Sequence, residues 1–106
     1  MSDQEILAEA VRRIREEYNP RRIVLFGSRA RGEAREDSDF DLMVVVDQTN
    51  DARQLAGDIR GTLAGLQASF DILVESQADW DKWRKVGPAL QHVIDREGRV
   101  VLDAAA

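Results

Sequence analysis

The 106-residue chain contains no cysteine and only one histidine. Without thiols it has neither a disulfide framework nor a thiolate metal site, and a zinc site is not expected. No apolar run approaches the roughly 20 residues that a membrane-spanning helix needs, and the N-terminus lacks the basic start and apolar middle of a signal peptide. We therefore expect a cytoplasmic protein that has no contact with a membrane.

A P-loop motif and a basic surface are also absent. No Gly-x-x-x-x-Gly-Lys-Ser/Thr sequence occurs, which excludes a P-loop enzyme. The net charge of −5 argues against a general nucleic-acid binder. The charges are unevenly placed, because eight arginines and three glutamates lie between Arg12 and Arg35, whereas six acids and no base lie between Glu36 and Asp51. This arrangement suits either a site for a metal-bound polyphosphate or two solvated faces of opposite charge.

The length and the apolar pattern predict a single domain, residues 1–106, with one core. Apolar residues at helical spacing and cap residues predict four helices, at 3–18, 51–66, 76–84 and from Pro88 to Gly98. Runs rich in β-branched residues predict four strands, at 21–26, 39–46, 69–74 and 99–102. The order α-β-β-α-β-α-α-β indicates an α/β (α+β) domain with a mixed β-sheet flanked by helices.

Several residues have structural interpretations. Three glycines spaced four apart, at 57, 61 and 65, are interpreted as a close approach of their helix to the sheet. His92 lies outside the apolar stripe of the last helix and is expected at the surface. Trp80 and Trp83 fit either packing in the core or an exposed patch that docks a partner.

The residues that suggest chemistry lie where strands meet turns. The strand that ends at Phe26 leads into Gly27-Ser28-Arg29-Ala30-Arg31-Gly32, and the backbone amides of such a glycine-rich turn can cradle a phosphate. The next strand begins with Asp39 and Asp41, which share one face if that strand starts by residue 39. Adjacent carboxylates repel each other unless a cation lies between them, although such a pair also fits caps and turns.

A third carboxylate, Asp71, strengthens the case for a metal. It lies in the otherwise apolar run from Phe70 to Val74, where an unpaired charge is costly to bury. If this strand lies beside the one that begins at Asp39, Asp71 converges on Asp39 and Asp41. Three carboxylates suit two Mg²⁺ ions roughly 3.5–4 Å apart, which activate an attacking oxygen and hold a leaving phosphate. The alternative is a residue at a strand edge that faces water.

The turn at 27–32, the sequence Ser38-Asp39-Phe40-Asp41-Leu42 and the later Asp71 together resemble the signature of minimal nucleotidyltransferases in the DNA polymerase beta superfamily. The resemblance covers nearly the whole chain. It implies a fold that transfers a nucleotide, with ATP as substrate and Mg²⁺ as cofactor.

Carried over by position, the resemblance also implies roles for single residues. Gly27 and Ser28 would bind the phosphates of the nucleotide, and Asp39 and Asp41 would ligate metal. Asp71 would be the third carboxylate, acting as base or ligand toward the acceptor hydroxyl. Of the two arginines in the turn, Arg29 and Arg31, one would contact phosphate and the other would pair with an acid.

A stand-alone domain of this kind resembles the antitoxin half of a toxin–antitoxin module. In that family the partner is a small helical RNase toxin of the HEPN class (higher eukaryotes and prokaryotes nucleotide-binding). The antitoxin transfers AMP to a tyrosine hydroxyl near the RNase active site. The resemblance thus implies ATP and such a toxin as partners, with no direct contact with nucleic acid. Two alternatives stay open: neutralisation by binding alone, and transfer to a small molecule such as an antibiotic.

Overall fold

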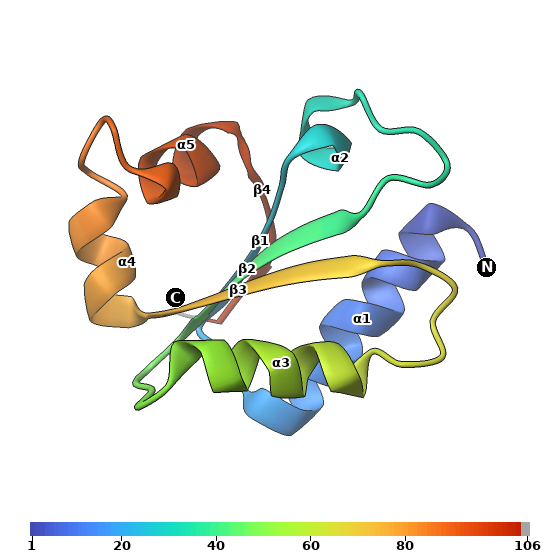
Figure 1. The fold of residues 1–106 in the computed structure, drawn as a ribbon, viewed down its shortest axis with the longest axis horizontal. Helices are drawn as coiled ribbons and strands as arrows, with labels where there is room; N and C mark the ends of the chain where they lie inside the picture. Colours follow the sequence, from blue (N-terminus) through green and yellow to red (C-terminus); the bar gives the residue numbers. More distant parts are fainter. Residues whose placement is uncertain (105–106) are drawn as a thin grey trace.

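A computed structural model describes residues 1–104, which form one four-stranded sheet with helices on both faces (Figure 1). The elements, in chain order, are α1 (Asp3–Tyr18), β1 (Arg22–Phe26), α2 (Ser28–Arg31), β2 (Phe40–Val46), α3 (Ala52–Thr62), β3 (Phe70–Ser76), α4 (Gln77–Trp83), α5 (Leu90–Glu97) and β4 (Arg99–Asp103). The strand order is β3-β2-β1-β4; β1 is antiparallel to β2 and β4, and β2 is parallel to β3. The predicted mixed sheet is confirmed.

The first helix follows from its local sequence. The Ser2 hydroxyl accepts a hydrogen bond from the Glu5 amide, and the Glu5 side chain accepts one from the Ser2 amide, which together form a capping box. Asn19 ends the helix in the left-handed conformation, at φ 47°. The predicted helix over 3–18 is confirmed. Among the described residues, no helix is both long enough and apolar enough to cross a membrane.

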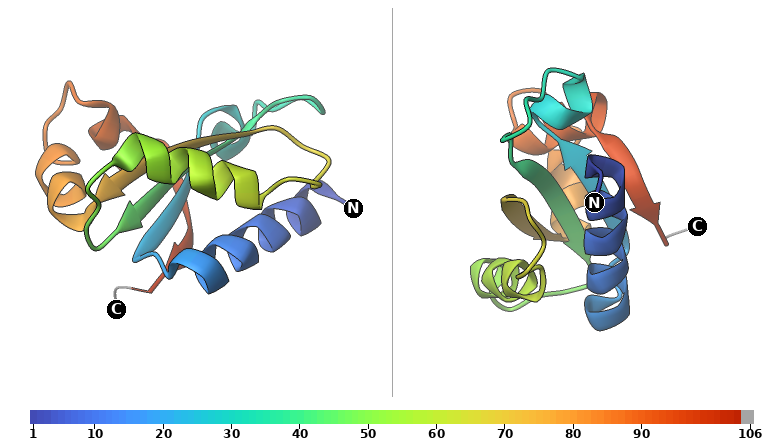
Figure 2. Two further views of the ribbon diagram at one scale, coloured as in Figure 1. Left: turned by 60° about the horizontal axis from the view of Figure 1, so that its bottom comes forward. Right: turned by 90° about the vertical axis from the view of Figure 1, so that its right-hand side faces the viewer.

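The sheet separates two apolar layers. On one face α1 and α3 pack against sheet residues such as Val44 and Ile72 (Figure 2). On the other face α4 and α5 contribute Trp80 and Ile94. Trp80 is fully buried, so the core interpretation holds for this tryptophan. Every residue of β2 from 42 to 46 is buried, as predicted for a central strand.

The glycine interpretation is wrong. The third helix ends at Thr62 instead of continuing to residue 66, so Gly65 lies beyond it with φ 90°. A Cβ atom built at Gly57, Gly61 or Gly65 would meet no other atom within 4 Å. Gly57 and Gly61 therefore leave one side of α3 open instead of bringing it close to the sheet.

The last helix also departs from prediction. It begins at Leu90 with Ala89 as its N-cap, so Pro88 precedes the helix and does not occupy its first position. His92 is partly buried, and its Nδ1 lies 2.8 Å from the carbonyl oxygen of Arg84, which corrects the expected surface position. Gly98 ends the helix as predicted.

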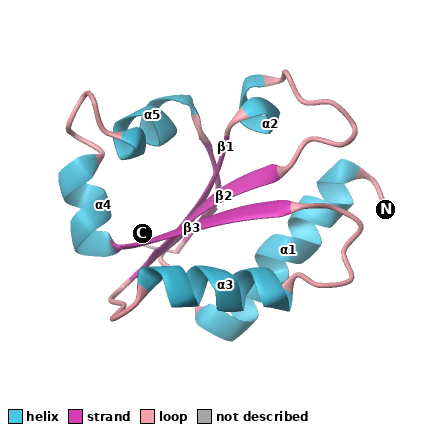
Figure 3. Ribbon diagram, viewed as in Figure 1, coloured by secondary structure: helices cyan, strands magenta, loops and turns pink. Residues whose placement is uncertain are grey.

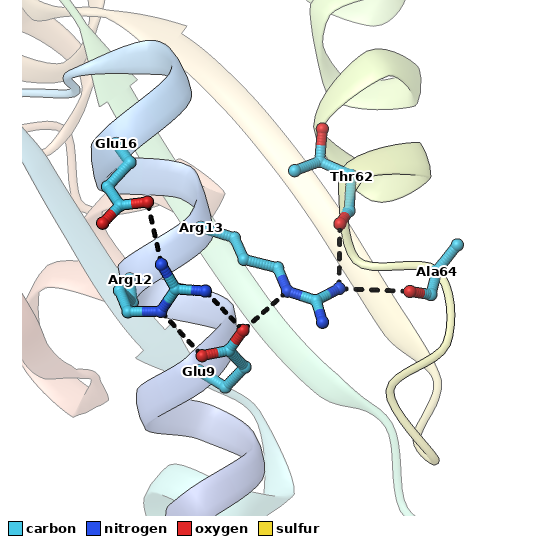
Figure 4. Close-up of polar contacts among 6 residues, drawn as sticks. All are labelled: Glu9, Arg12, Arg13, Glu16, Thr62 and Ala64. Carbon is cyan, nitrogen blue, oxygen red and sulfur yellow. Dashed lines mark hydrogen bonds and ion pairs between the residues drawn. The ribbon is translucent and has the colours of Figure 1, made fainter.

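A polar cluster joins the first helix to the end of the third (Figure 4). The Arg13 guanidinium donates hydrogen bonds to the carbonyl oxygens of Thr62 and Ala64, at 3.2 and 3.1 Å. Its Nε donates to Glu9 at 2.8 Å, while Arg12 bonds to Glu9 and Glu16 on the same helix. Because the last carbonyls of a helix have no partner within it, Arg13 stabilises the C-terminus of α3.

Candidate active site

The sheet topology gathers the predicted site at one end of the sheet. Because β1 and β2 are antiparallel, the turn that follows β1 lies beside the beginning of β2, with Phe26 paired to Asp41. Because β2 and β3 are parallel and in register, Asp41 is paired directly with Asp71. Figure 3 shows the loops that precede β2 and β3 at this same end. The predicted convergence of Asp41 and Asp71 is therefore present.

The backbone at Gly27 approaches the Asp41 carboxylate closely. Gly27 has φ 75° and ψ −156°, a conformation that side chains rarely adopt. A Cβ atom at this position would overlap the Oδ2 atom of Asp41. Position 27 thus requires glycine both for its backbone conformation and for its contact with Asp41.

The turn after Gly27 presents backbone donors near these acids. The amides of Ala30 and Arg31 both donate to the Gly27 carbonyl oxygen, at 3.1 and 3.2 Å, and so close the first turn of α2. The amides of Ser28 and Arg29 precede these bonds, at the position where helical N–H groups have no partner within the helix. Two donors are thus placed where an anion could be bound.

The three aspartates share an electrostatic environment. Burial raises the pKa of the half-buried Asp41 above its ordinary value; the carboxylates of Asp71 and Asp39 raise it further, and Arg31 lowers it. Asp71 is exposed, and Asp39 is exposed one residue before β2 begins, so the strand starts one residue later than expected. The predicted condition, that the strand starts by residue 39, is therefore missed by one residue, and Asp39 lies in the loop just before β2.

The acidic cluster fits a divalent cation in its chemistry. Within residues 1–104, no three acidic or histidine side chains already lie in an arrangement that could hold a metal ion. The donors are all carboxylate oxygens, which Mg²⁺ prefers. The mutual repulsion that raises the Asp41 pKa is also relieved when a cation binds. The residues present therefore suit Mg²⁺.

The two arginines of the turn have different surroundings. The Arg29 side chain is only 8% exposed; it donates to the Ser38 carbonyl oxygen through Nε and Nη2, at 3.1 and 2.7 Å, and pairs with Asp3 at 3.0 Å. Arg31 is 42% exposed, and its one ion pair within the described chain is with Glu33, at 3.3 Å. Arg29 is thus held by protein groups, and Arg31 is the arginine whose guanidinium is open to a ligand.

One contributor to the site was not identified from the sequence. Phe40 lies between the two aspartates, where its ring stacks on Phe70 with centroids 5.3 Å apart, and the Arg29 guanidinium lies 3.9 Å from the Phe40 centroid. The dipeptide Phe-Asp occurs at both 40–41 and 70–71, and these copies are in register on β2 and β3. The repeated dipeptide in the sequence indicates that the two strands pair in register, because stacking of the two phenylalanine rings places the two aspartates side by side.

Comparison with known proteins identifies the family. Two proteins of Methanocaldococcus jannaschii are similar over part of the chain. "Putative protein adenylyltransferase MJ1379" is 45% identical over 47 residues, which are 44% of this chain and 47% of the relative. "Putative protein adenylyltransferase MJ1215" is 44% identical over 48 residues, 45% of this chain and 56% of that relative. The chain spans about half the length of the curated relatives it matches.

The family model for the nucleotidyltransferase domain matches residues 7–96, and this range holds every predicted site residue. The chain belongs to the nucleotidyltransferase domain family.

Proposed function

We propose that this protein transfers AMP from ATP to a hydroxyl group of another protein, with Mg²⁺ as cofactor. The observation that carries the proposal is the pairing of Asp41 with Asp71 across β2 and β3, directly beside the glycine at position 27. Membership of the nucleotidyltransferase domain family supports the chemistry. The names of the two archaeal relatives support a protein as the acceptor.

Each side chain of the site has a role in this proposal. Asp39, Asp41 and Asp71 would hold Mg²⁺, two ions if all three carboxylates take part. When bound, Mg²⁺ neutralises the triphosphate and the leaving pyrophosphate. The turn at Gly27 and Ser28 would bind phosphate oxygens through the backbone amides of Ser28 and Arg29. Arg31 would provide a positive charge beside them.

The transfer itself needs positioning and one proton acceptor. The acceptor oxygen attacks the α-phosphorus, the bond from that phosphorus to the bridging oxygen breaks, and pyrophosphate leaves. The hydroxyl proton passes to a carboxylate, for which we propose Asp71 because its side chain is exposed at the end of β3. Asp41 is less available for this role because it lies against Gly27.

We further propose that the acceptor is a tyrosine of a helical HEPN RNase toxin, so that the protein acts as an antitoxin. This proposal rests on the sequence resemblance of a minimal domain to such antitoxins. In this proposal the partner supplies the acceptor hydroxyl. It also predicts that labelled AMP appears on the partner protein.

The decisive experiment is AMP transfer from labelled ATP to a co-purified HEPN toxin. Asp39→Asn and Asp41→Asn should each reduce incorporation by roughly 100-fold or more, since even the outer partners of metal ligands contribute 10- to 100-fold. EDTA should abolish the reaction. Asp37→Asn, which changes an exposed aspartate of the same loop, is the matched control and should retain activity.

Two outcomes would contradict the proposal. Undiminished labelling by Asp41→Asn, with its fold verified by circular dichroism, would exclude the carboxylate cluster as the catalytic site. If the Asp39→Asn/Asp41→Asn double variant silences the toxin as well as the wild type at equal expression, neutralisation needs binding alone. Transfer of AMP to an aminoglycoside but not to the protein would identify a small-molecule acceptor instead.

A further inference from the structure

Among residues 1–104, no strand pairs with the outer edge of β3. The strand lies at the end of the sheet opposite to β4 (Figure 2). The Phe40 amide donates to the Ser69 carbonyl oxygen at 2.9 Å, and because the direction of backbone groups alternates along a strand, odd-numbered residues of β3 face β2. The amides and carbonyls of Ile72 and Val74 consequently point away from the sheet.

This edge is neither short nor interrupted, although shortness and interruption protect many edge strands. It is seven residues long, contains no proline and pairs with β2 without a bulge. By contrast, β4 at the other edge has five residues and a register shift in its pairing with β1. Long and regular edges are templates for an added strand unless something blocks them. The two edges of this sheet therefore differ in their capacity to accept one.

A groove of about 490 Å³ runs along this open edge, between α3 and α5. Four consecutive residues of β3, from Ile72 to Glu75, line it, so both faces and the edge of the strand contribute to the groove. Leu90, 54% exposed, lines the side formed by α5. Gly57 lies in the opposite wall, which α3 forms. Because it has no side chain and nothing lies within 4 Å of where its Cβ would be, the groove is open at this position. The groove is thus open and partly apolar.

The charges of the groove favour an acidic segment. Arg53 and Arg60 line its α3 wall, and in the described part of the chain neither has an acidic partner. Seven helical residues separate them by about 10 Å, the length of roughly three strand residues. At the other wall one Glu75 carboxylate oxygen accepts from Gln91, while the second is shielded from water and has no hydrogen-bond partner.

We infer, on the basis of the proposed function, that the acceptor protein binds by adding an extended acidic segment to the open edge of β3. Its backbone pairs with Ile72 and Val74, and its acidic side chains lie against Arg53 and Arg60. Asp71 precedes these groove residues on the same strand, so a hydroxyl residue of the added strand beside Asp71 lies about one strand spacing, ~4.8 Å, from it. Docking along β3 thus selects which hydroxyl reaches the carboxylates.

A second copy of this chain fits the groove less well than an acidic segment. Two copies paired through β3 would bring the same arginines and the same Glu75 to both sides of the interface. Two copies paired antiparallel around Leu73 would also place Asp71 opposite Glu75, and like charges directly opposite each other destabilise a strand pair. An acidic segment instead complements both arginines.

The test measures backbone amide exchange in the whole chain by NMR. The probes are a short peptide of alternating valine and glutamate with one tyrosine, and its counterpart with lysine in place of glutamate. Saturating glutamate peptide should slow exchange at Ile72 and Val74 by about tenfold or more, since newly paired amides exchange only on opening. The Arg53→Glu/Arg60→Glu variant should weaken binding roughly tenfold, the sum of two exposed ion pairs.

The matched control is Arg15→Glu/Arg99→Glu, which makes the same charge change at exposed arginines away from β3 and should bind normally. No protection by the glutamate peptide, or equal protection by the lysine peptide, would overturn the inference. Protection that grows with protein concentration in the absence of peptide would assign the edge to a second copy. If AMP is transferred to a toxin but the peptide does not slow amide exchange in β3, the docking inference is refuted and the proposed function stands. If the peptide slows exchange but no AMP is transferred, the docking inference stands and the proposed function is refuted.

Discussion

At the scale of single residues, the candidate site depends on two close contacts, one made by the backbone of Gly27 and one made by the side chain of Arg29. Gly27 lies so near Asp41 that any side chain at position 27 would displace the carboxylate. Arg29 is the second case, because its buried guanidinium joins the N-terminus of α1 to the loop that leads into β2. The first residue shapes the space beside the acids, and the second fixes the loop from which Asp39 projects.

The different surroundings of the two arginines predict different effects of substitution. Arg29→Lys should lower the free energy of unfolding by about 2 kcal/mol, because lysine loses the paired bonds to Ser38 and the planar contact with Phe40. Arg31→Lys should change it by less than about 0.5 kcal/mol, as is usual at exposed positions. Urea unfolding measures both. Equal destabilisation by the two variants would show that Arg29 does not hold the loop.

At the scale of elements, α3 depends on a contact from outside itself for its C-terminal end. The helix ends near Thr62, where Arg13 of α1 bonds to the carbonyl oxygens of Thr62 and Ala64. The Tyr18 hydroxyl lies 2.9 Å from the Thr62 hydroxyl and adds a second link. The two helices on this face of the sheet are thus joined by polar contacts as well as by the core.

Arg13→Gln should therefore destabilise the protein more than Arg12→Gln. The first change removes charged hydrogen bonds between elements and should cost about 1.5 kcal/mol. The second removes exposed pairs within α1, which solvent screens, and should cost less than the first. Chemical denaturation gives both values, and amide exchange should rise at the end of α3 in Arg13→Gln only. Faster exchange there in both variants would contradict the link.

Comparison of the predicted with the observed elements shows which features of the fold can be predicted from the sequence. Strands and helices with strong periodicity, such as 3–18 and 39–46, were predicted within one residue because their signals are local. The pairing of Asp41 with Asp71 could be stated only conditionally, since it depends on which strands become neighbours. The end of α3 and the bonds of Arg29 to the Ser38 carbonyl oxygen were not predictable, because both depend on where distant loops return. The Phe-Asp repeat at 40–41 and 70–71 was a readable signal that was missed.

At the scale of the whole molecule, clustered carboxylates oppose folding while the site holds no cation. Asp41 is half-buried and faces Asp71 and Asp39, and within residues 1–104 Arg31 is the one cation that offsets their charge. Among the described residues its carboxylate has neither a hydrogen bond nor an ion pair. These acids therefore reduce global stability at neutral pH, which is the cost expected if the proposed activity needs an arrangement that folding disfavours.

This electrostatic cost predicts the pH dependence of stability. A carboxyl group whose pKa is raised by folding contributes stability below its unfolded value of 3.8, and that contribution is lost as the pH rises through the folded pKa. Asp41→Asn should therefore be more stable than the wild type at pH 7, by at most about 1 kcal/mol for a charge that solvent screens.

Thermal or urea unfolding from pH 3 to pH 8 measures this difference. The gain should shrink as the pH falls toward 3.8, because Asp41 is then protonated in the wild type as well. Mg²⁺ should stabilise the wild type at pH 7 and have a smaller effect on Asp41→Asn, since a ligand that binds only the folded state raises its stability by mass action. Asp37→Asn should show neither effect. A stability gain for Asp41→Asn that stays constant across this pH range would mean that its origin is packing and not the charge of Asp41, which burial and the neighbouring carboxylates disfavour.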